Sequence, residues 1–325
     1  MSAPQRVVVV GASAGGVEAL RDFVANLPAD LPATVCVVLH IPANAPTALP
    51  GILDRSGPLP AIPARDGDPL QAGVIVVASS DRHLLVGESE VAVSRGPREN
   101  GHRPAVDVLF RTAARWWGPR ALAVVLSGSL DDGAAGALAV ADRGGTVFVH
   151  DPALAHYPGM PRAALAAVPA ATTGTPAQLA KLVADACRAA AAAAAPVDER
   201  LEVETAMAFL DEEAHARTER PGRPAGVACP DCGGAMFELD HEAMVRFRCR
   251  VGHAWSPESL ITQQVEDTEA ALWTAIRTME EGAAVQRKLA GRTTGAVQAH
   301  HDERAAEADA SAAAIRALLR DGART

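Results

Sequence analysis

Arg6-Val7-Val8-Val9-Val10 leads directly into Gly11-Ala12-Ser13-Ala14-Gly15-Gly16 near the start of the chain. An almost continuously apolar run of this length is typical of a parallel strand that is buried on both faces. Similar runs follow at residues 34–39, 73–78, 121–127 and 146–150. The segments between them, such as residues 16–27 and 106–117, are amphipathic and long enough for the crossovers of a parallel sheet. We therefore predict an α/β fold with a doubly wound, mostly parallel sheet and helices on both faces.

The composition agrees with a globular protein of about two domains. Of the 325 residues, 49% are hydrophobic and 21% are charged. No run of 18 apolar residues is present, and Arg6 enters the first strand without the apolar segment of a signal peptide. We therefore expect a cytoplasmic protein with no membrane insertion.

The two halves of the chain differ in charge. Up to Pro196 there are 15 basic and 16 acidic residues, and after it there are 15 basic and 23 acidic residues. Because nucleic acid is a polyanion, we expect no nucleic-acid partner.

The turn after the first strand has two interpretations. A glycine-rich turn can cradle a dinucleotide, but that fingerprint requires a glycine where Ser13 stands and an acid where the second strand instead ends in His40. The alternative is a nucleophile elbow, because Gly-x-Ser-x-Gly between a strand and a helix exposes the serine oxygen. We favour the elbow.

Two partners for a nucleophilic serine follow other strands of the same predicted sheet. His40 comes directly after residues 34–39, and Asp131 and Asp132 come after residues 121–127. The carboxyl ends of parallel strands meet at one edge, so these side chains can converge. A serine needs a base, and the base needs a carboxylate to orient it. Ser13, His40 and one of the two aspartates therefore form a candidate catalytic triad.

A metal-binding pattern occurs late in the chain. Cys229 and Cys232 form a C-x-x-C turn, and Cys249 and His253 follow after sixteen intervening residues with C-x-x-x-H spacing. Three thiolates and one imidazole suit a closed tetrahedral zinc site. We predict structural zinc here; the alternatives are a redox C-x-x-C, or His241 as the fourth ligand. Cys36 and Cys187 are expected to be inert core thiols.

The predicted organisation has four parts. Residues 1–195 form the α/β domain, which ends in an Ala-rich helix capped by Thr175 and extending to Ala195. Residues 196–227 form a helical segment and linker, residues 228–256 a zinc-ribbon-like module, and residues 257–325 a helical hairpin. Such a hairpin also offers a surface for homo-oligomer formation.

Five motifs, in order, resemble those of the CheB family of chemotaxis protein-glutamate methylesterases. They are residues 11–16, Leu39-His40-Ile41-Pro42, residues 103–110, residues 126–136 and Gly159-Met160-Pro161-Arg162-Ala163-Ala164. The resemblance covers residues 6–182. It implies Ser13 as nucleophile, His40 as general base and Asp132, rather than Asp131, as the orienting carboxylate. It also implies oxyanion donors at the backbone N–H groups of Ala14 and Ser129.

The reaction implied by this resemblance is hydrolysis of glutamate γ-methyl esters on chemoreceptors, with release of methanol, together with deamidation of glutamines. No cofactor is implied for catalysis. Two features depart from the family pattern: Gly128-Ser129-Leu130 replaces the usual Gly-Met-Gly, and the chain begins five residues before the first strand, where the family usually carries a receiver domain. We therefore expect regulation from outside this polypeptide.

Two other functions are kept as alternatives. One is a signalling adaptor without catalysis that retains the esterase fold, and the other is a serine esterase or amidase that acts on a non-receptor substrate. His83, His102 and Arg103, near the same sheet edge, could contact an acidic receptor surface, but we expect each to lie in a solvated loop.

Overall fold

The computed structural model describes residues 2–44, 48–212, 222–241 and 244–322. The chain forms two compact units, Met1–Leu260 and Ile261–Thr325. The four-part division expected above, with boundaries at residues 195, 227 and 256, stays a prediction.

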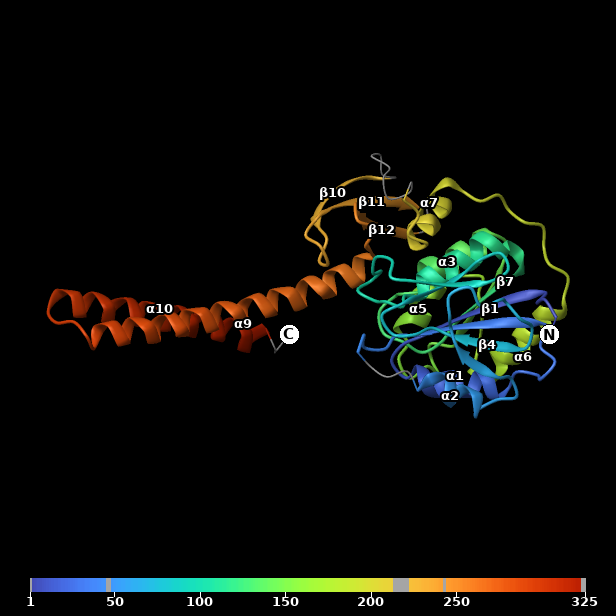
Figure 1. Cartoon of the computed structure of the whole chain (residues 1–325), viewed down its shortest axis with the longest axis horizontal. Coiled ribbons are helices and arrows are strands. Elements are labelled where there is room, and N and C mark those ends of the chain that lie inside the picture. Colours follow the sequence, from blue (N-terminus) through green and yellow to red (C-terminus); the bar gives the residue numbers. More distant parts are fainter. Residues whose placement is uncertain (1, 45–47, 213–221, 242–243, 323–325) are drawn as a thin grey trace. The chain divides into compact units, whose positions relative to one another are not determined.

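The larger unit is built on a seven-stranded sheet in which every neighbouring pair is parallel (Figure 1). The strand order is β3-β4-β2-β1-β7-β8-β9. Their bounds are β1 Arg6–Ala12, β2 Ala33–Leu39, β3 Ala61–Pro63, β4 Val74–Val77, β7 Ala121–Val125, β8 Thr146–His150 and β9 Thr172–Gly174. The predicted parallel sheet is confirmed, and β3 and β9 are short edge strands that the apolar pattern did not indicate.

Alternate residues of β1 face opposite layers of helices. Val8 and Val10 lie in one hydrophobic cluster with residues of α1 (Gly16–Ala25), α2 (Leu49–Asp54) and α6 (Pro176–Arg188). Val7 and Val9 lie in the other with residues of α3 (Val106–Trp117), α4 (Ala134–Asp142) and α5 (Gly159–Ala167). The period of two along a strand places successive side chains on opposite faces, so β1 is buried on both sides. The doubly wound arrangement is thus confirmed.

The helix α6 begins as predicted but ends early. Thr175 accepts a hydrogen bond from the N–H of Gln178 and forms a capping box with it. The helix ends at Arg188 rather than Ala195. Residues 190–194 are exposed alanines that bury no apolar face, and the Arg6 guanidinium binds the carbonyl oxygen of Ala189 at 2.6 Å. Packing rather than helix propensity therefore decides where this helix ends.

Several smaller elements complete the larger unit. They are the hairpin β5 (His83–Val86) and β6 (Val91–Ser94), the 3₁₀ turn η1 (Gly118–Arg120), the helix α7 (Glu199–Ala208), and a four-stranded antiparallel sheet of β10 (Arg223–Ala228), β11 (Ala235–His241), β12 (Met244–Cys249) and β13 (Ala254–Trp255). The strand β10 begins at Arg223, within residues 196–227, which we expected to form a helical segment and linker. We call residues 223–256 the Cys/His module.

The helix α9 (Pro257–Ala290) begins directly after Ser256, and α10 (Ala296–Gly322) folds back on it. His301 Nδ1 lies 2.7 Å from Gln286 Oε1, and ion pairs join Arg287 to Asp309 and Arg316 to Glu280. These contacts define an antiparallel hairpin. A search of the described residues finds no helix long and apolar enough to cross a membrane.

Candidate functional site

Ser13 and His40 follow neighbouring strands at the same edge of the sheet. In the parallel register Ala12 lies opposite Leu39, and the N–H of His40 donates to the carbonyl of Ala12 at 3.1 Å. Ser13 is therefore the first residue beyond β1, and His40 the first beyond β2. The N–H of Ser13 also bonds to the carbonyl of Ser127, beyond the end of β7, at 2.9 Å. The chain leaves β1 toward β2 and later returns to β7, so this edge is a topological switch point where loops diverge.

The turn at Ser13 differs from a strained nucleophile elbow. The residue with left-handed backbone is Gly15, with φ of 67°, and Ser13 is not among the positive-φ residues. Glycine adopts this conformation without steric cost, so the strain of an elbow is absent from the serine. Opposite the turn, a Cβ on Gly128 would lie 2.0 Å from Met160 Sδ and 3.0 Å from Ser13 Cβ. Only glycine at residue 128 leaves room beside Ser13.

His40 and Asp132 are in direct contact. His40 Nε2 lies 2.7 Å from Asp132 Oδ2, and the two side chains are 7% and 2% exposed. An ionised carboxylate only accepts hydrogen bonds, so Nε2 carries the proton and Nδ1 keeps its lone pair. His40 Nδ1 is buried without a hydrogen-bond partner among the described residues. The imidazole thus holds one unpaired basic nitrogen.

Asp132 is stabilised as a carboxylate by its surroundings. Its oxygens accept hydrogen bonds from the N–H groups of Val106 at 2.6 Å and Asp107 at 3.1 Å, at the positive end of α3. Burial opposes ionisation, but the hydrogen bond and the charge of His40 hold the pKa of Asp132 well below its usual range. The carboxylate is therefore charged at neutral pH.

Asp131, the neighbouring candidate, faces a different group of residues. Its Oδ1 accepts hydrogen bonds from the hydroxyl groups of Ser256 and Ser259, each at 2.8 Å. Of the two aspartates, Asp132 is the one that contacts His40.

The two backbone groups expected as oxyanion donors lie on turns beside Ser13. Ala14 follows it directly, and the Ser127 hydroxyl donates to the Ala14 carbonyl at 2.8 Å. Ser129 is exposed, and the next residue, Leu130, has a left-handed φ of 58°. Within the described ranges, neither the N–H of Ala14 nor that of Ser129 is bound to an acceptor.

His102, expected in a solvated loop, instead packs against the candidate base. Its ring stacks on that of His40, with centroids 3.7 Å apart and planes 18° apart. Burial, aided by His40, lowers the pKa of His102 to about 4, so its ring is neutral at pH 7. The only signal in the sequence was its place four residues before the start of α3.

His83, also expected in a solvated loop, is instead buried. It is 1% exposed, and its two ring nitrogens lie 3.0 Å from the Pro97 carbonyl and 3.2 Å from the Ala105 N–H. Burial lowers the pKa of His83 to about 4. This histidine holds two loops together.

A cleft of about 400 Å³ opens beside His40. It is lined by His40, Ile41, Pro42, Ala43, Arg98, Gly101, His102 and Arg103. Arg103 is held in place by Asp81, at 2.6 Å. The two arginines give the cleft a cationic rim.

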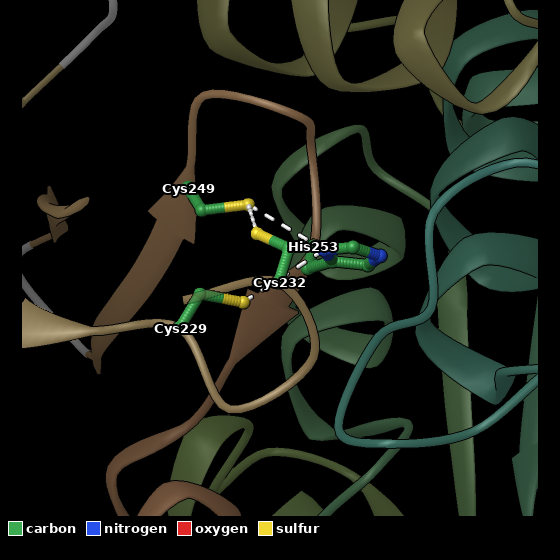
Figure 2. A group of neighbouring side chains, drawn as sticks. All are labelled: Cys229, Cys232, Cys249 and His253. Carbon is green, nitrogen blue, oxygen red and sulfur yellow. Dashed lines mark hydrogen bonds between the residues drawn. The ribbon is translucent and has the colours of Figure 1, made fainter. Parts of the chain in front are cut away.

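The four predicted metal ligands converge in the Cys/His module, as Figure 2 shows. Cys232 Sγ lies 3.7 Å from Cys249 Sγ, and His253 Nδ1 lies 3.7 Å from Cys229 Sγ and 3.6 Å from Cys249 Sγ. A tetrahedral zinc ion with ordinary bond lengths separates two sulfurs by about 3.8 Å and a sulfur and a nitrogen by about 3.6 Å. These three distances match those of a tetrahedral zinc site, and all four ligand atoms lie within 4.8 Å of one another. His241 ends β11, and its side chain lies outside the described residues.

The remaining cysteines lie in the α/β layers. Cys36 and Cys187 are buried, and burial raises the pKa of each thiol to about 12. Thiols with such pKa values are poor nucleophiles and metal ligands.

The chain is similar to several curated proteins. Protein-glutamate methylesterase/protein-glutamine glutaminase 2 of Anaeromyxobacter dehalogenans is 42% identical over 159 residues, which cover 49% of this chain and 47% of that protein. The corresponding protein of Symbiobacterium thermophilum is 40% identical over 160 residues, covering 49% and 44%. The chain thus spans about half the length of the curated relatives that it matches.

The structural comparison leads to the same family. The crystal structure of the Thermotoga maritima CheB methylesterase catalytic domain superposes with a TM-score of 0.54 at 29% identity, covering 55% of this chain and 97% of that domain. The model of the CheB methylesterase family matches residues 8–183, more than half of the chain. This chain therefore belongs to the CheB methylesterase family.

Proposed function

We propose that this protein is a serine hydrolase that removes methyl groups from glutamate γ-methyl esters of chemoreceptors. The observation that carries the proposal is the 2.7 Å contact between His40 Nε2 and Asp132 Oδ2. His40 follows Leu39, which is paired with Ala12, and Ser13 follows Ala12 on the neighbouring strand. The names of the relatives supply the substrate class.

In the first half of the reaction Ser13 is the nucleophile. Its Oγ attacks the ester carbonyl while His40 Nδ1, the unpaired nitrogen, takes the hydroxyl proton. Asp132 stabilises the resulting imidazolium through Nε2. The N–H groups of Ala14 and Ser129 bind the oxyanion, and His40 then gives the proton to the leaving methanol, which leaves an acyl-enzyme.

Water completes the reaction. His40 accepts a proton from a water molecule that attacks the acyl carbon, and returns this proton to Ser13 Oγ as the acyl bond breaks. The products are the glutamate carboxylate and the regenerated serine. A glutamine side chain passes through the same steps with ammonia as leaving group. Because the three side chains supply nucleophile, base and orienting group, this chemistry requires no cofactor.

The Cys/His module holds zinc in this proposal. A closed set of three thiolates and one imidazole leaves no open coordination position, so the ion has a structural role. When bound, zinc would contribute free energy of folding to a small module whose core contains few large side chains.

The partners we propose are methylated chemoreceptors, reached from the cytoplasm. Arg98 and Arg103 at the rim of the cleft suit an acidic surface around the methylated glutamate.

The test is methanol release from membranes that carry methylated chemoreceptors. The native protein should release methanol and Ser13→Ala should not, while both retain the same circular dichroism spectrum. Ser89→Ala, at an exposed position in the turn between β5 and β6, serves as the matched control, with activity near that of the native protein. Equal release by Ser13→Ala would exclude Ser13 as the nucleophile.

A further inference from the structure

Asn100 connects the carboxylate of the proposed triad to the Cys/His module. Its side chain is buried, and Nδ2 donates to Asp132 Oδ1 and to Asp107 Oδ2, each at 3.3 Å. On its other side, Oδ1 accepts a hydrogen bond from the N–H of Ser256 at 2.8 Å. Because a backbone N–H can only donate, this bond fixes Oδ1 toward Ser256 and Nδ2 toward the carboxylates.

The backbone of Asn100 is held by the same segment. Its N–H donates to the carbonyl of Ala254 at 2.8 Å, and the N–H of Ala254 donates to the carbonyl of Arg98 at 3.2 Å. Asn100 has a left-handed φ of 51°, which asparagine tolerates better than most residues. Residues 254–256 therefore set both the backbone and the amide orientation of Asn100.

This segment directly follows a predicted metal ligand. His253 precedes Ala254, and the N–H of Cys249 bonds to the carbonyl of His253 at 2.9 Å. Trp255, 2% exposed, shares one hydrophobic cluster with Cys229 and Cys249. The metal-binding turn thus determines where β13 and Ser256 lie.

A second set of contacts fixes the module against the α/β domain. The hydroxyl of Ser256 binds Asp131, the residue before Asp132. Deeper in the contact, Arg248 of β12 donates to Glu99 at 2.9 Å and to Glu204 at 2.7 Å, and all three side chains are buried. Both neighbours of the triad carboxylate, Asn100 and Asp131, are therefore bound by one segment of the module.

We propose that the Cys/His module positions the triad carboxylate through Asn100, so that hydrolysis depends on an intact metal-binding turn. Asn100 is a positioning residue: it donates to the oxygen of Asp132 that does not face His40, and it fixes the carboxylate in the plane that the imidazole requires. This inference rests on the proposed function of Ser13, His40 and Asp132.

The experiment compares Asn100→Gly, Asn100→Asp and the native full-length chain, using p-nitrophenyl acetate as the ester. Glycine suits the left-handed backbone and deletes the amide, whereas aspartate keeps the shape and replaces the donor with a carboxylate oxygen. We expect kcat to fall about tenfold or more in both, with KM unchanged, because a hydrogen bond to a charged group is lost. Asn26→Asp, on an exposed helix end, is the matched control and should leave kcat unchanged.

Metal removal by a chelator supplies the second arm. Metal removal should lower kcat of the native chain by about the same factor as Asn100→Gly does. In the Asn100→Gly variant, metal removal should lower kcat little further. Hydrogen exchange gives a readout without catalysis: the amides of Val106 and Asp107, which donate to Asp132, should lose protection after metal removal, while those of β1 stay protected.

The outcomes separate the two proposals. If metal removal changes neither kcat nor the exchange protection of the Val106 and Asp107 amides, the module does not position Asp132. A native chain without activity on any ester would overturn the proposed function, and the exchange measurement would still decide whether the module positions Asp132.

Discussion

Asp132 caps α3, the helix that contains Asp107, and Asp107 caps α4, the helix that follows Asp132. Asp132, in the turn before α4, accepts hydrogen bonds from the N–H groups of Val106 and Asp107 at the start of α3. Asp107 in turn accepts from Gly133 at 3.0 Å and Gly136 at 2.6 Å at the start of α4. Two helix N-termini thus surround two buried carboxylates, and this exchange fixes the loop that carries Asp132 beside His40.

Replacement of Asp132 tests the orienting role. Asp132→Asn offers an amide in place of the acceptor for His40 Nε2–H, so the wrong imidazole tautomer is favoured. We expect kcat to fall about 10³-fold or more, as measured by methanol release. Asp131→Asn, one residue earlier, should keep activity within about tenfold. A larger loss in Asp131→Asn than in Asp132→Asn would reverse the assignment.

The second carboxylate gives a pH dependence of stability. Burial, together with the charge of Asp132, raises the pKa of Asp107 to about 7 from its usual 3.8. Between those values the folded state binds more protons than the unfolded state, so this group's stabilisation is lost as pH rises. The free energy of unfolding of Asp107→Asn relative to the native chain should therefore increase from pH 5.5 to pH 8 in urea titrations. A difference that is independent of pH would contradict the raised pKa.

The stacked histidine pair predicts a graded effect. His102→Ala removes the ring that packs on His40, and we expect kcat to fall about 2- to 10-fold. His102→Phe keeps a flat ring there and should retain most of the activity. If both variants lose activity equally, the contribution of His102 lies in its nitrogens and not in stacking.

The buried ion cluster should dominate the stability of the module contact. Burial opposes ionisation of Glu99, but the charges of Arg111, Arg248 and Arg246 lower its pKa to about 2. Glu204→Ala leaves these buried guanidinium groups without one of their two carboxylates and should cost about 3–5 kcal/mol in the free energy of unfolding. Glu202→Ala, two residues earlier on α7, breaks an exposed pair with Arg115 and should cost less than about 1 kcal/mol. Equal losses would argue against the cluster.

Metal analysis should find about one zinc per chain. Cys232→Ser should remove it, since this variant deletes one of four ligands that lie within 4.8 Å of one another. Cys187→Ala, buried in α6 and outside that group, should keep the zinc. A chain that is fully folded and free of metal would refute the site.

The parallel sheet was predictable from the sequence, because strands buried on both faces need continuous apolar runs such as Val7 to Val10. Residue type and short spacing also indicated the candidate residues at the carboxyl edge and the three cysteines of a metal site, but left His241 and His253 open as the fourth ligand. The helix cap at Thr175 was also predictable, because it depends on residues next to it in the sequence.

The contacts between distant segments could not be predicted from the sequence. Asp132 contacts His40 because its carboxylate is the one that binds the N-terminus of α3. The pattern of apolar residues does not distinguish two neighbouring aspartates in a turn. The stacking of His102 on His40 and the bond from Ser256 to Asn100 join residues 62 and 156 positions apart. Such contacts carry no local pattern, because they arise from the packing of whole elements and not from the propensity of any one segment.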